Sequence, residues 1–166
     1  MRSRHRYLPL LAALGALVLQ GSFLPAFSFR GVQPDLVLIV CVLTGFFRGP
    51  RQGAVVGAAT GFLEDVLAGR HLGLMVLARA TAGGLAGSVT RYLQHRSVLL
   101  PGLACLLATA LQRAVMAAAV AIAGAGPVAP LGDGRLWAEA AANGLLASLL
   151  CLPAQRAARR RPSLAA

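Results

Sequence analysis

The chain has 166 residues, of which 57% are apolar and 13% are charged, and its formal net charge is +11 at pH 7. Soluble domains contain roughly 45–50% apolar and roughly 25% charged residues, so this composition excludes an ordinary soluble domain and favours a membrane protein. All sixteen basic residues are arginines that lie mainly in patches beside apolar runs. Such patches set membrane orientation and contact anionic lipids, which argues against nucleic-acid binding.

Six apolar segments follow one another along the chain, and each is predicted to cross the bilayer as a helix. They comprise residues 8–27, 34–47, 53–67, 72–93, 98–123 and 136–152. A transmembrane helix needs about 20 apolar residues to cross about 30 Å of hydrocarbon, and the first, fourth and fifth segments reach that length. The first is also longer than the apolar part of a signal peptide, so we expect it to be retained. The pattern predicts an all-α, polytopic membrane protein with six transmembrane helices, in which residues 1–166 form one membrane domain.

The second and third segments are short, at 14 and 15 residues. Helical rise gives them a reach of only about 21–23 Å, so a re-entrant hairpin is the alternative to two full spans. Arg48 and Arg51 lie at the tip of that hairpin and would then stop inside hydrocarbon, which is costly. Their placement favours two full spans, with side-chain snorkelling and local bilayer thinning covering the shortfall.

The arginines also predict the orientation. With six spans, one side of the membrane holds eleven arginines and the other side holds Arg30, Arg70 and Arg135. The eleven are Arg2, Arg4, Arg6, Arg48, Arg51, Arg91, Arg96, Arg156, Arg159, Arg160 and Arg161. Because arginine-rich loops stay on the cytoplasmic side, both termini are predicted to be cytoplasmic.

The third segment carries a glycine at every fourth position. Gly53, Gly57 and Gly61 therefore share one helix face, where missing side chains let another helix approach closely. Glu64 and Asp65 extend that face and are expected to point into protein rather than lipid. The sequence also leaves an oligomer open.

The fourth segment has a matching face made of Arg79, Gly83 and Gly87. An arginine deep in the bilayer costs about 2.5–3.5 kcal/mol on insertion scales and almost always has a partner. Arg79 is therefore predicted to pair with Glu64 or Asp65. Either a binding site or proton relay, or a structural ion pair, explains such a contact, and the scarcity of other polar residues favours the structural pair.

The fifth and sixth segments hold a second intramembrane charge. Arg113 is expected to pair with Glu139, with Gln112 and Asn143 at a similar depth.

No motif for catalysis or cofactor binding is present in the sequence. The three histidines lie near membrane edges, and the three cysteines lie in apolar runs without a ligand-type spacing. Glu64 and Asp65 form a lone acidic pair without a second set of ligands, so no metal site is predicted. We expect no catalytic residue, no metal and no cofactor.

Two ordered motifs resemble a known family. Residues 34–38, from Pro34 and Asp35 onward, together with residues 48–51 and 53–57, resemble the rod shape-determining protein MreD family. Residues 61–69 and 72–73 are similar to that family's second signature, in which Asp65 or its neighbour Glu64 matches a usual aspartate. The resemblance covers about residues 34–93, and beyond residue 97 it extends to hydropathy only.

The resemblance implies a non-enzymatic subunit of the bacterial cell-elongation machinery, located in the cytoplasmic membrane. Such a subunit binds the bitopic protein MreC, with MreB, RodA and a class B penicillin-binding protein in the wider complex. The family is also similar in helix layout to the substrate-binding subunits of vitamin transporters. A small solute-binding component of a transporter is therefore the alternative function.

Overall fold

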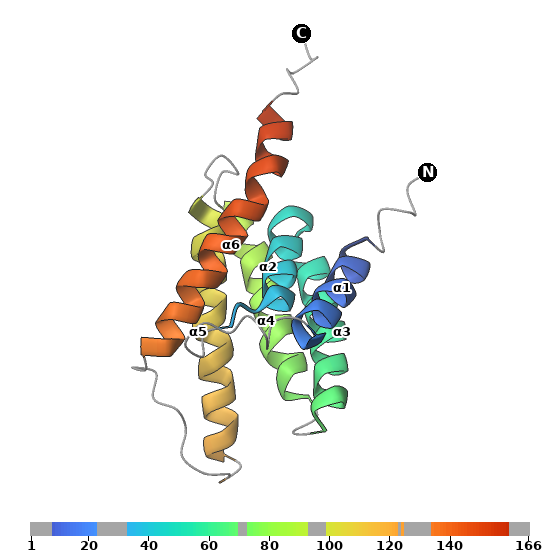
Figure 1. The fold of residues 1–166 in the computed structure, drawn as a ribbon, viewed down its shortest axis with the longest axis vertical. Coiled ribbons are helices and arrows are strands. Elements are labelled where there is room, and N and C mark those ends of the chain that lie inside the picture. Colours follow the sequence, from blue (N-terminus) through green and yellow to red (C-terminus); the bar gives the residue numbers. More distant parts are fainter. Residues whose placement is uncertain are drawn as a thin grey trace.

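The computed structural model describes residues 8–22, 33–69, 73–92, 99–122, 124 and 134–159. These residues form six α-helices and no β-strand (Figure 1). The helices are α1 (Leu8–Ser22), α2 (Leu36–Arg48), α3 (Pro50–Ala68), α4 (Leu74–Tyr92), α5 (Leu99–Ile122) and α6 (Gly134–Arg159). The predicted all-α class is confirmed.

Each predicted segment corresponds to one helix, but the helix ends differ from the predicted bounds. The helix α3 starts at Pro50 instead of residue 53 and has 19 residues, which gives it a length of about 28 Å. The α6 helix continues through Pro153 to Arg159, beyond the predicted end at residue 152. The predicted end was set by the apolar run, which stops before the helix does. Residues 23–27 of the first predicted segment lie outside the described residues.

Local backbone chemistry fixes the start and the end of α2. Asp35 is the N-cap, and its Oδ1 accepts a hydrogen bond from the Leu38 amide at 2.9 Å. The apolar pattern predicted a start at Pro34, but the helix begins after Asp35. At the other end Gly49 has a φ of 93°, a backbone conformation that residues with a side chain rarely adopt. Pro50 follows directly as the first residue of α3. Proline suits the first helical turn because its missing N–H has no partner there.

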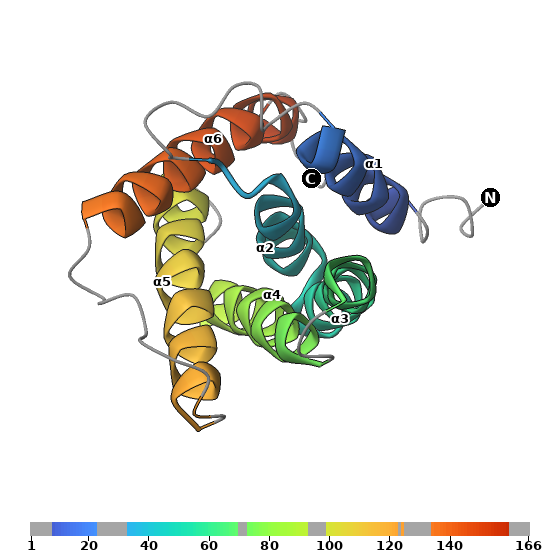
Figure 2. The same ribbon diagram turned by 60° about the horizontal axis from the view of Figure 1, so that its bottom comes forward.

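The helix α2 is the centre of the bundle. It packs against all five other helices, which surround it in Figure 2. One apolar cluster lies between α2 and the α4, α5 and α6 helices; its buried residues are Leu38, Ile39, Val42, Ala82, Ala86, Cys105, Ala108 and Ala147. A second cluster joins α2 to α1 and α3; its buried residues are Ala13, Ala16, Val37, Cys41 and Val56. The polar side chains near Asp35 are thus positioned by a helix with neighbours on every side.

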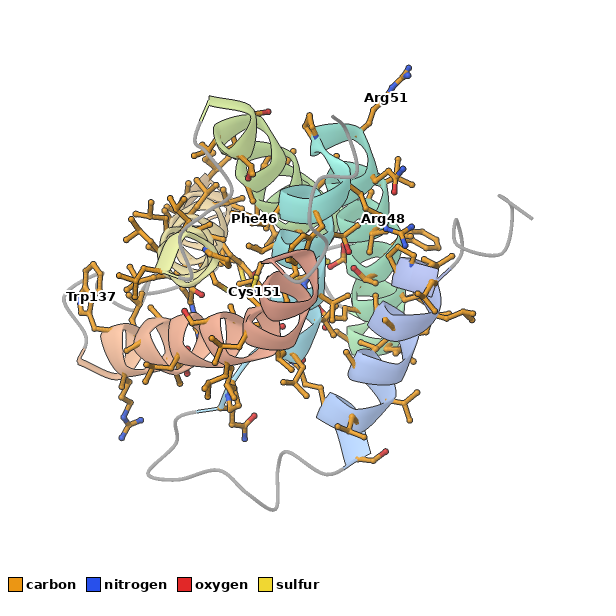
Figure 3. The ribbon with its side chains drawn as sticks, turned by 90° about the horizontal axis from the view of Figure 1, so that it is seen from above. Phe46, Arg48, Arg51, Trp137 and Cys151 are labelled. Carbon is orange, nitrogen blue, oxygen red and sulfur yellow. The ribbon has the colours of Figure 1, made fainter. Side chains whose placement is uncertain are left out.

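Polar side chains are buried in this bundle, whereas large apolar side chains are exposed. The buried polar and charged residues are Thr44, Thr60, Asp65, Arg79, Thr90, Thr109, Gln112 and Asn143. Every helix exposes large apolar side chains; Phe62 of α3 and Trp137 of α6 are more than half exposed. Figure 3 shows Trp137 at the left edge of the molecule, beside the start of α6, whereas the buried Cys151 lies within the bundle. This is the reverse of a soluble domain and suits a lipid environment.

Length and composition alone give a weaker membrane signal. By that test α5 is the one described helix long and apolar enough to cross a membrane, while α1, α2 and residues Leu74–Thr90 are apolar but shorter. The glycines and buried charged residues of α3 lower its apolarity although its outer face is apolar. The burial pattern is therefore the more informative of the two observations.

Candidate functional site

The helices α3 and α4 pack with their backbones in contact through the two predicted glycine faces. A Cβ atom added to Gly53 would lie within 3.0 Å of the Gly83 backbone, and one added to Gly57 would lie equally close to the Arg79 backbone. Gly61 meets the Met75 backbone in the same way. Each step of four residues along α3 is matched by a step of four in the opposite direction along α4, so the two helices are antiparallel. No other residue type fits at these positions without moving a helix.

The same close approach includes α2. A Cβ on Gly45 would clash with the Gly83 backbone, and one on Gly87 would lie 2.6 Å from the Cα of Pro50. Gly87 therefore packs against the junction of α2 and α3. The tight contacts hold the backbones of α2, α3 and α4 at fixed distances, which fixes the positions from which their charged side chains project.

Arg79 lies between two carboxylates from different helices. Its Nη2 is 2.7 Å from Oε2 of Glu64 on α3 and 3.1 Å from Oδ2 of Asp35 at the start of α2. The Arg79 side chain is 2% exposed, and each of the two carboxylate side chains is 17% exposed. Of the two partners that the sequence suggested for Arg79, the structure thus places Glu64 in contact, and it adds Asp35.

Asp65, the other partner suggested for Arg79, bonds to backbone amides instead. Its Oδ2 accepts hydrogen bonds from the amides of Gly73 at 2.8 Å and Val76 at 3.4 Å, and its Oδ1 accepts one from Met75 at 3.2 Å. Gly73 directly precedes α4, and Met75 and Val76 belong to its first turn, so no carbonyl of the helix can reach these amides. Asp65 therefore caps α4 from the end of α3, and a carboxylate there also suits the helix dipole.

Asp35 joins four helices. Its carboxylate caps α2, pairs with Arg79 and accepts a hydrogen bond from Gln112 Nε2 of α5 at 3.3 Å. Its backbone amide donates to Oδ1 of Asn143 on α6 at 2.8 Å. Asn143 in turn donates from Nδ2 to Thr109 Oγ1 on α5 at 3.1 Å. We call the set Asp35, Glu64, Arg79, Thr109, Gln112 and Asn143 the polar cluster.

A second ion pair lies beside the polar cluster. Arg113 of α5 pairs with Glu139 of α6, as the sequence suggested. The Arg113 side chain is 47% exposed, in contrast to the buried Arg79. This pair and the polar cluster both bridge α5 to the rest of the bundle.

A polar cavity of about 190 Å³ lies next to the polar cluster. It is lined by side chains that all carry polar groups and come from α1, α5, α6 and the segment before α2: Gln20, Gln33, Asp35, Thr109, Gln112, Arg113, Glu139 and Asn143. The helix α1 packs against α2 and α3 but, in the described part of the chain, not against α6. The cavity occupies the place where these two helices stay apart.

The arrangement provides ion pairs and hydrogen-bonding groups that join the helices. Among the described residues no group of three or more histidine, cysteine, aspartate or glutamate side chains could hold a metal ion. None of the three cysteines, all of which the structure describes, forms a disulfide, and all three are buried. The three histidines, which were predicted to lie near membrane edges, fall outside the described residues. What the polar cluster does is to cross-link α2, α3, α4, α5 and α6 around the start of α2.

Burial and packing together define an all-helical protein of the membrane class, with its polar contacts inside and its apolar side chains outside. The family model for the rod shape-determining protein MreD matches residues 1–132. Since that range is well over half of the chain, the chain belongs to the MreD family. No curated protein and no solved structure matches it.

The match confirms the resemblance and extends it. The motifs covered about residues 34–93, whereas the matched range also takes in α1 and α5 and therefore Gln112 and Arg113. It ends before α6, which supplies Glu139 and Asn143.

Sequence reasoning missed the contacts of Asp35 with Arg79, Gln112 and Asn143. Asp35 had been singled out only as part of a motif, although a lone aspartate directly before an apolar run is a signal for a helix N-cap. The close approach of Gly102 on α5 to Gly144 on α6 was also missed. Neither glycine belongs to a four-residue series, so the sequence pattern gave no reason to select them.

Proposed function

We propose that this chain is a non-enzymatic scaffold of the cell-elongation machinery that binds MreC within the cytoplasmic membrane. The wider complex in this proposal contains MreB, RodA and a class B penicillin-binding protein. Membership of a family of rod shape-determining proteins supports the proposal at the level of cell shape. The finer assignment to MreC rests on the family resemblance.

One structural observation carries the scaffold proposal. The charged side chains of the bundle interior are engaged in ion pairs and helix caps that join helices, while every helix turns large apolar side chains outward. A rigid bundle with an apolar exterior presents helix faces on which a partner's transmembrane helix can pack.

We further propose six membrane spans with both termini in the cytoplasm. The bias of eleven arginines to three supports this orientation. Arg48 and Arg51, at the junction of α2 and α3, then lie at the cytoplasmic surface, and Figure 3 shows Arg51 extending away from the bundle. Asp35, Glu64 and the cavity lie toward the opposite end of α2 and α3, in the outer half of the bilayer.

The alternative function, a solute-binding component of a transporter, has one observation in its favour. This is the polar cavity, which in the proposed topology faces the outer side. A transporter component is expected to bind its solute tightly and to function with an energising partner, whereas a scaffold is expected to lose its function when its helix partner is removed. The two functions therefore differ in what depletion does to the cell.

The experiment is depletion of the protein in a rod-shaped cell that depends on it. The scaffold proposal predicts that cells become round and that MreC is lost from its membrane complex. Re-expression of the wild-type chain, or of a Thr81→Ala variant, restores both; the Thr81 hydroxyl bonds only within its own helix and serves as the matched control. Unchanged cell shape, together with tight binding of a vitamin-like solute to the purified protein, would favour the transporter component instead.

A further inference from the structure

One face of the central helix α2 is left open by its neighbours. Of its thirteen residues, five are not buried: Leu36, Val40, Leu43, Phe47 and the terminal Arg48. The first four follow one another at steps of four, three and four residues, so they lie along a single stripe of the helix. We call these four residues the open face of α2.

The open face points between α1 and α6. Val40 packs beside the apolar cluster that α2 forms with α1 and α3, whereas Leu43 packs beside the cluster with α4, α5 and α6. On the opposite side of α2, a Cβ added to Gly45 would clash with the α4 backbone, so that side is closed. In the ring of helices around α2, α1 and α6 are neighbours that do not pack against each other in the described part of the chain (Figure 2).

The polar cavity lies at the outer end of the open face. Its lining includes Gln33 and Asp35, which closely precede Leu36, together with Gln20 near the end of α1 and Glu139 near the start of α6. The cavity and the open face thus lie between the same two helices. From Leu36 to Phe47 the face extends about 17 Å along the helix. An occupant of the whole strip is therefore apolar over about 17 Å and polar at one end.

The polar end offers hydrogen-bond donors and acceptors together. Arg113 lines the cavity with a side chain that is 47% exposed; Nη2 bonds to Glu139, and the other N–H groups form no hydrogen bond within the described residues. Gln33 is exposed, and its carboxamide both donates and accepts. A hydroxyl or carboxamide group matches such a lining because it also does both. The volume of about 190 Å³ is sufficient for one such side chain, since about 150 Å³ holds benzene.

A lipid does not match the strip. In the proposed topology α2 ends at the cytoplasmic surface, and its thirteen residues reach about 20 Å into the bilayer. The polar end therefore lies within the hydrocarbon, which is about 30 Å thick, and lipid headgroups lie outside it. Acyl chains have no hydrogen-bonding group to offer there, and unpaired polar groups are costly in hydrocarbon.

A second copy of the chain does not match the strip either. Two copies related by a twofold axis bring the same face of each together. Because α2 lies inside the ring of the other helices, α1 and α6 of the two copies would meet first and leave both open faces empty. A single helix from another protein has no such obstacle.

We propose that the open face of α2 docks the single transmembrane helix of the partner, MreC in the proposed function, between α1 and α6. The partner helix packs apolar side chains on Val40, Leu43 and Phe47 and places a hydroxyl or carboxamide side chain in the polar cavity. This inference rests on the proposed function and adds to it the contact surface and the chemistry of the partner helix.

The test places the photo-crosslinking residue benzoylphenylalanine at Phe47 of the full chain, in membranes that also contain MreC. Phe62 on α3 is the matched control, because it is also an exposed phenylalanine, at 58% against 49% for Phe47, but belongs to another helix. A crosslinked product of the two proteins is expected from Phe47 and not from Phe62. Both replacements alter exposed aromatic side chains only, and size-exclusion chromatography checks that both variants are folded.

Co-purification of MreC with the wild-type chain separates this inference from the proposed function. If MreC is retained but crosslinks from Phe62 alone or from neither position, the docking face is overturned and the scaffold function stands. A crosslink from Phe47 to a second copy of the chain, or to lipid alone, also overturns the docking face. If the wild-type chain retains no MreC, the scaffold function and the docking face fail together.

The polar end is tested on the partner helix. Leucine replaces, one at a time, each hydroxyl or carboxamide side chain in the outer half of the MreC helix. One of these replacements is expected to weaken retention about two- to tenfold, as for the loss of one hydrogen bond. An MreC helix in which no such replacement weakens retention would overturn the assignment of its polar group to the cavity.

Discussion

Replacing Arg79 by alanine tests the polar cluster most sharply. The substitution leaves Asp35 and Glu64, each 17% exposed, as two carboxylates without the cation that lies between them. Removing one partner of a buried ion pair costs about 3–5 kcal/mol. At about 1.4 kcal/mol for each factor of ten, that is a loss of more than about a hundredfold in the ratio of folded to unfolded protein.

Removing either carboxylate alone is expected to cost less, because Arg79 keeps the other one. A hydrogen bond to a charged group contributes about 1.5–3 kcal/mol, which sets the expected loss for Glu64→Gln. Asp35→Ala is expected to be worse than Asp35→Asn, since asparagine still caps α2 and alanine does not, a difference of about 0.5–2 kcal/mol. The expected order of stability is therefore wild type, then Glu64→Gln and Asp35→Asn, then Arg79→Ala.

The assay is reversible unfolding in mixed micelles, followed by Trp137 fluorescence and arranged as double-mutant cycles. Arg79 is expected to couple to Glu64 and to Asp35 by about 0.5–3 kcal/mol in each cycle. Asp65 is the matched control on the same helix, because its carboxylate bonds to the amides of Gly73, Met75 and Val76. Strict additivity of Arg79 with Glu64, or a larger coupling with Asp65, would refute the geometry of the cluster.

Three further predictions concern packing, capping and topology. Gly57→Ala forces the α3 and α4 backbones apart and is expected to destabilise the protein by about 1–3 kcal/mol. The control Gly15→Ala, with nothing within 4 Å of the added Cβ, is expected to be neutral or slightly stabilising. Equal effects of the two substitutions in the same unfolding assay would contradict the close approach of α3 and α4. Asp65→Ala is expected to increase hydrogen exchange in the first turn of α4 at a cost of about 0.5–2 kcal/mol, and unchanged exchange there would argue against the cap. Reporter fusions after Arg96 and after Arg161 are expected to be cytoplasmic and one after Gly132 external, and an external signal from the C-terminal fusion would disprove the topology.

The class of fold was predictable because its signals are periodic and strong. Long apolar runs predicted six helices in the observed order, and the four-residue glycine spacing predicted which faces of α3 and α4 meet. The ends of the helices were less predictable, since apolarity marks lipid-facing residues while caps mark helix ends. Asp35 and Pro50 illustrate this: neither belongs to the apolar core of a predicted segment, yet Asp35 caps the start of α2 and Pro50 is the first residue of α3.

The polar cluster was only partly predictable. A buried arginine requires a carboxylate partner. Because a short turn joins the third and fourth segments, the sequence limited the expected partners of Arg79 to Glu64 and Asp65. The contacts of Asp35 with Arg79 and Gln112 span 44 and 77 residues of sequence separation. Which helices surround α2, and in what order, decides such contacts, and a single sequence carries no direct signal for that order.

The central claim, that the chain is a scaffold which holds MreC through contacts within the membrane, is tested most directly by co-purification. Tagged wild-type chain and MreC are expressed together, extracted in mild detergent and captured on the tag, with Arg79→Ala and Thr81→Ala in parallel. The wild type and Thr81→Ala are expected to retain MreC through a size-exclusion column, and Arg79→Ala is expected to lose it. Wild-type chain that is folded and monodisperse but retains no MreC would contradict the scaffold proposal.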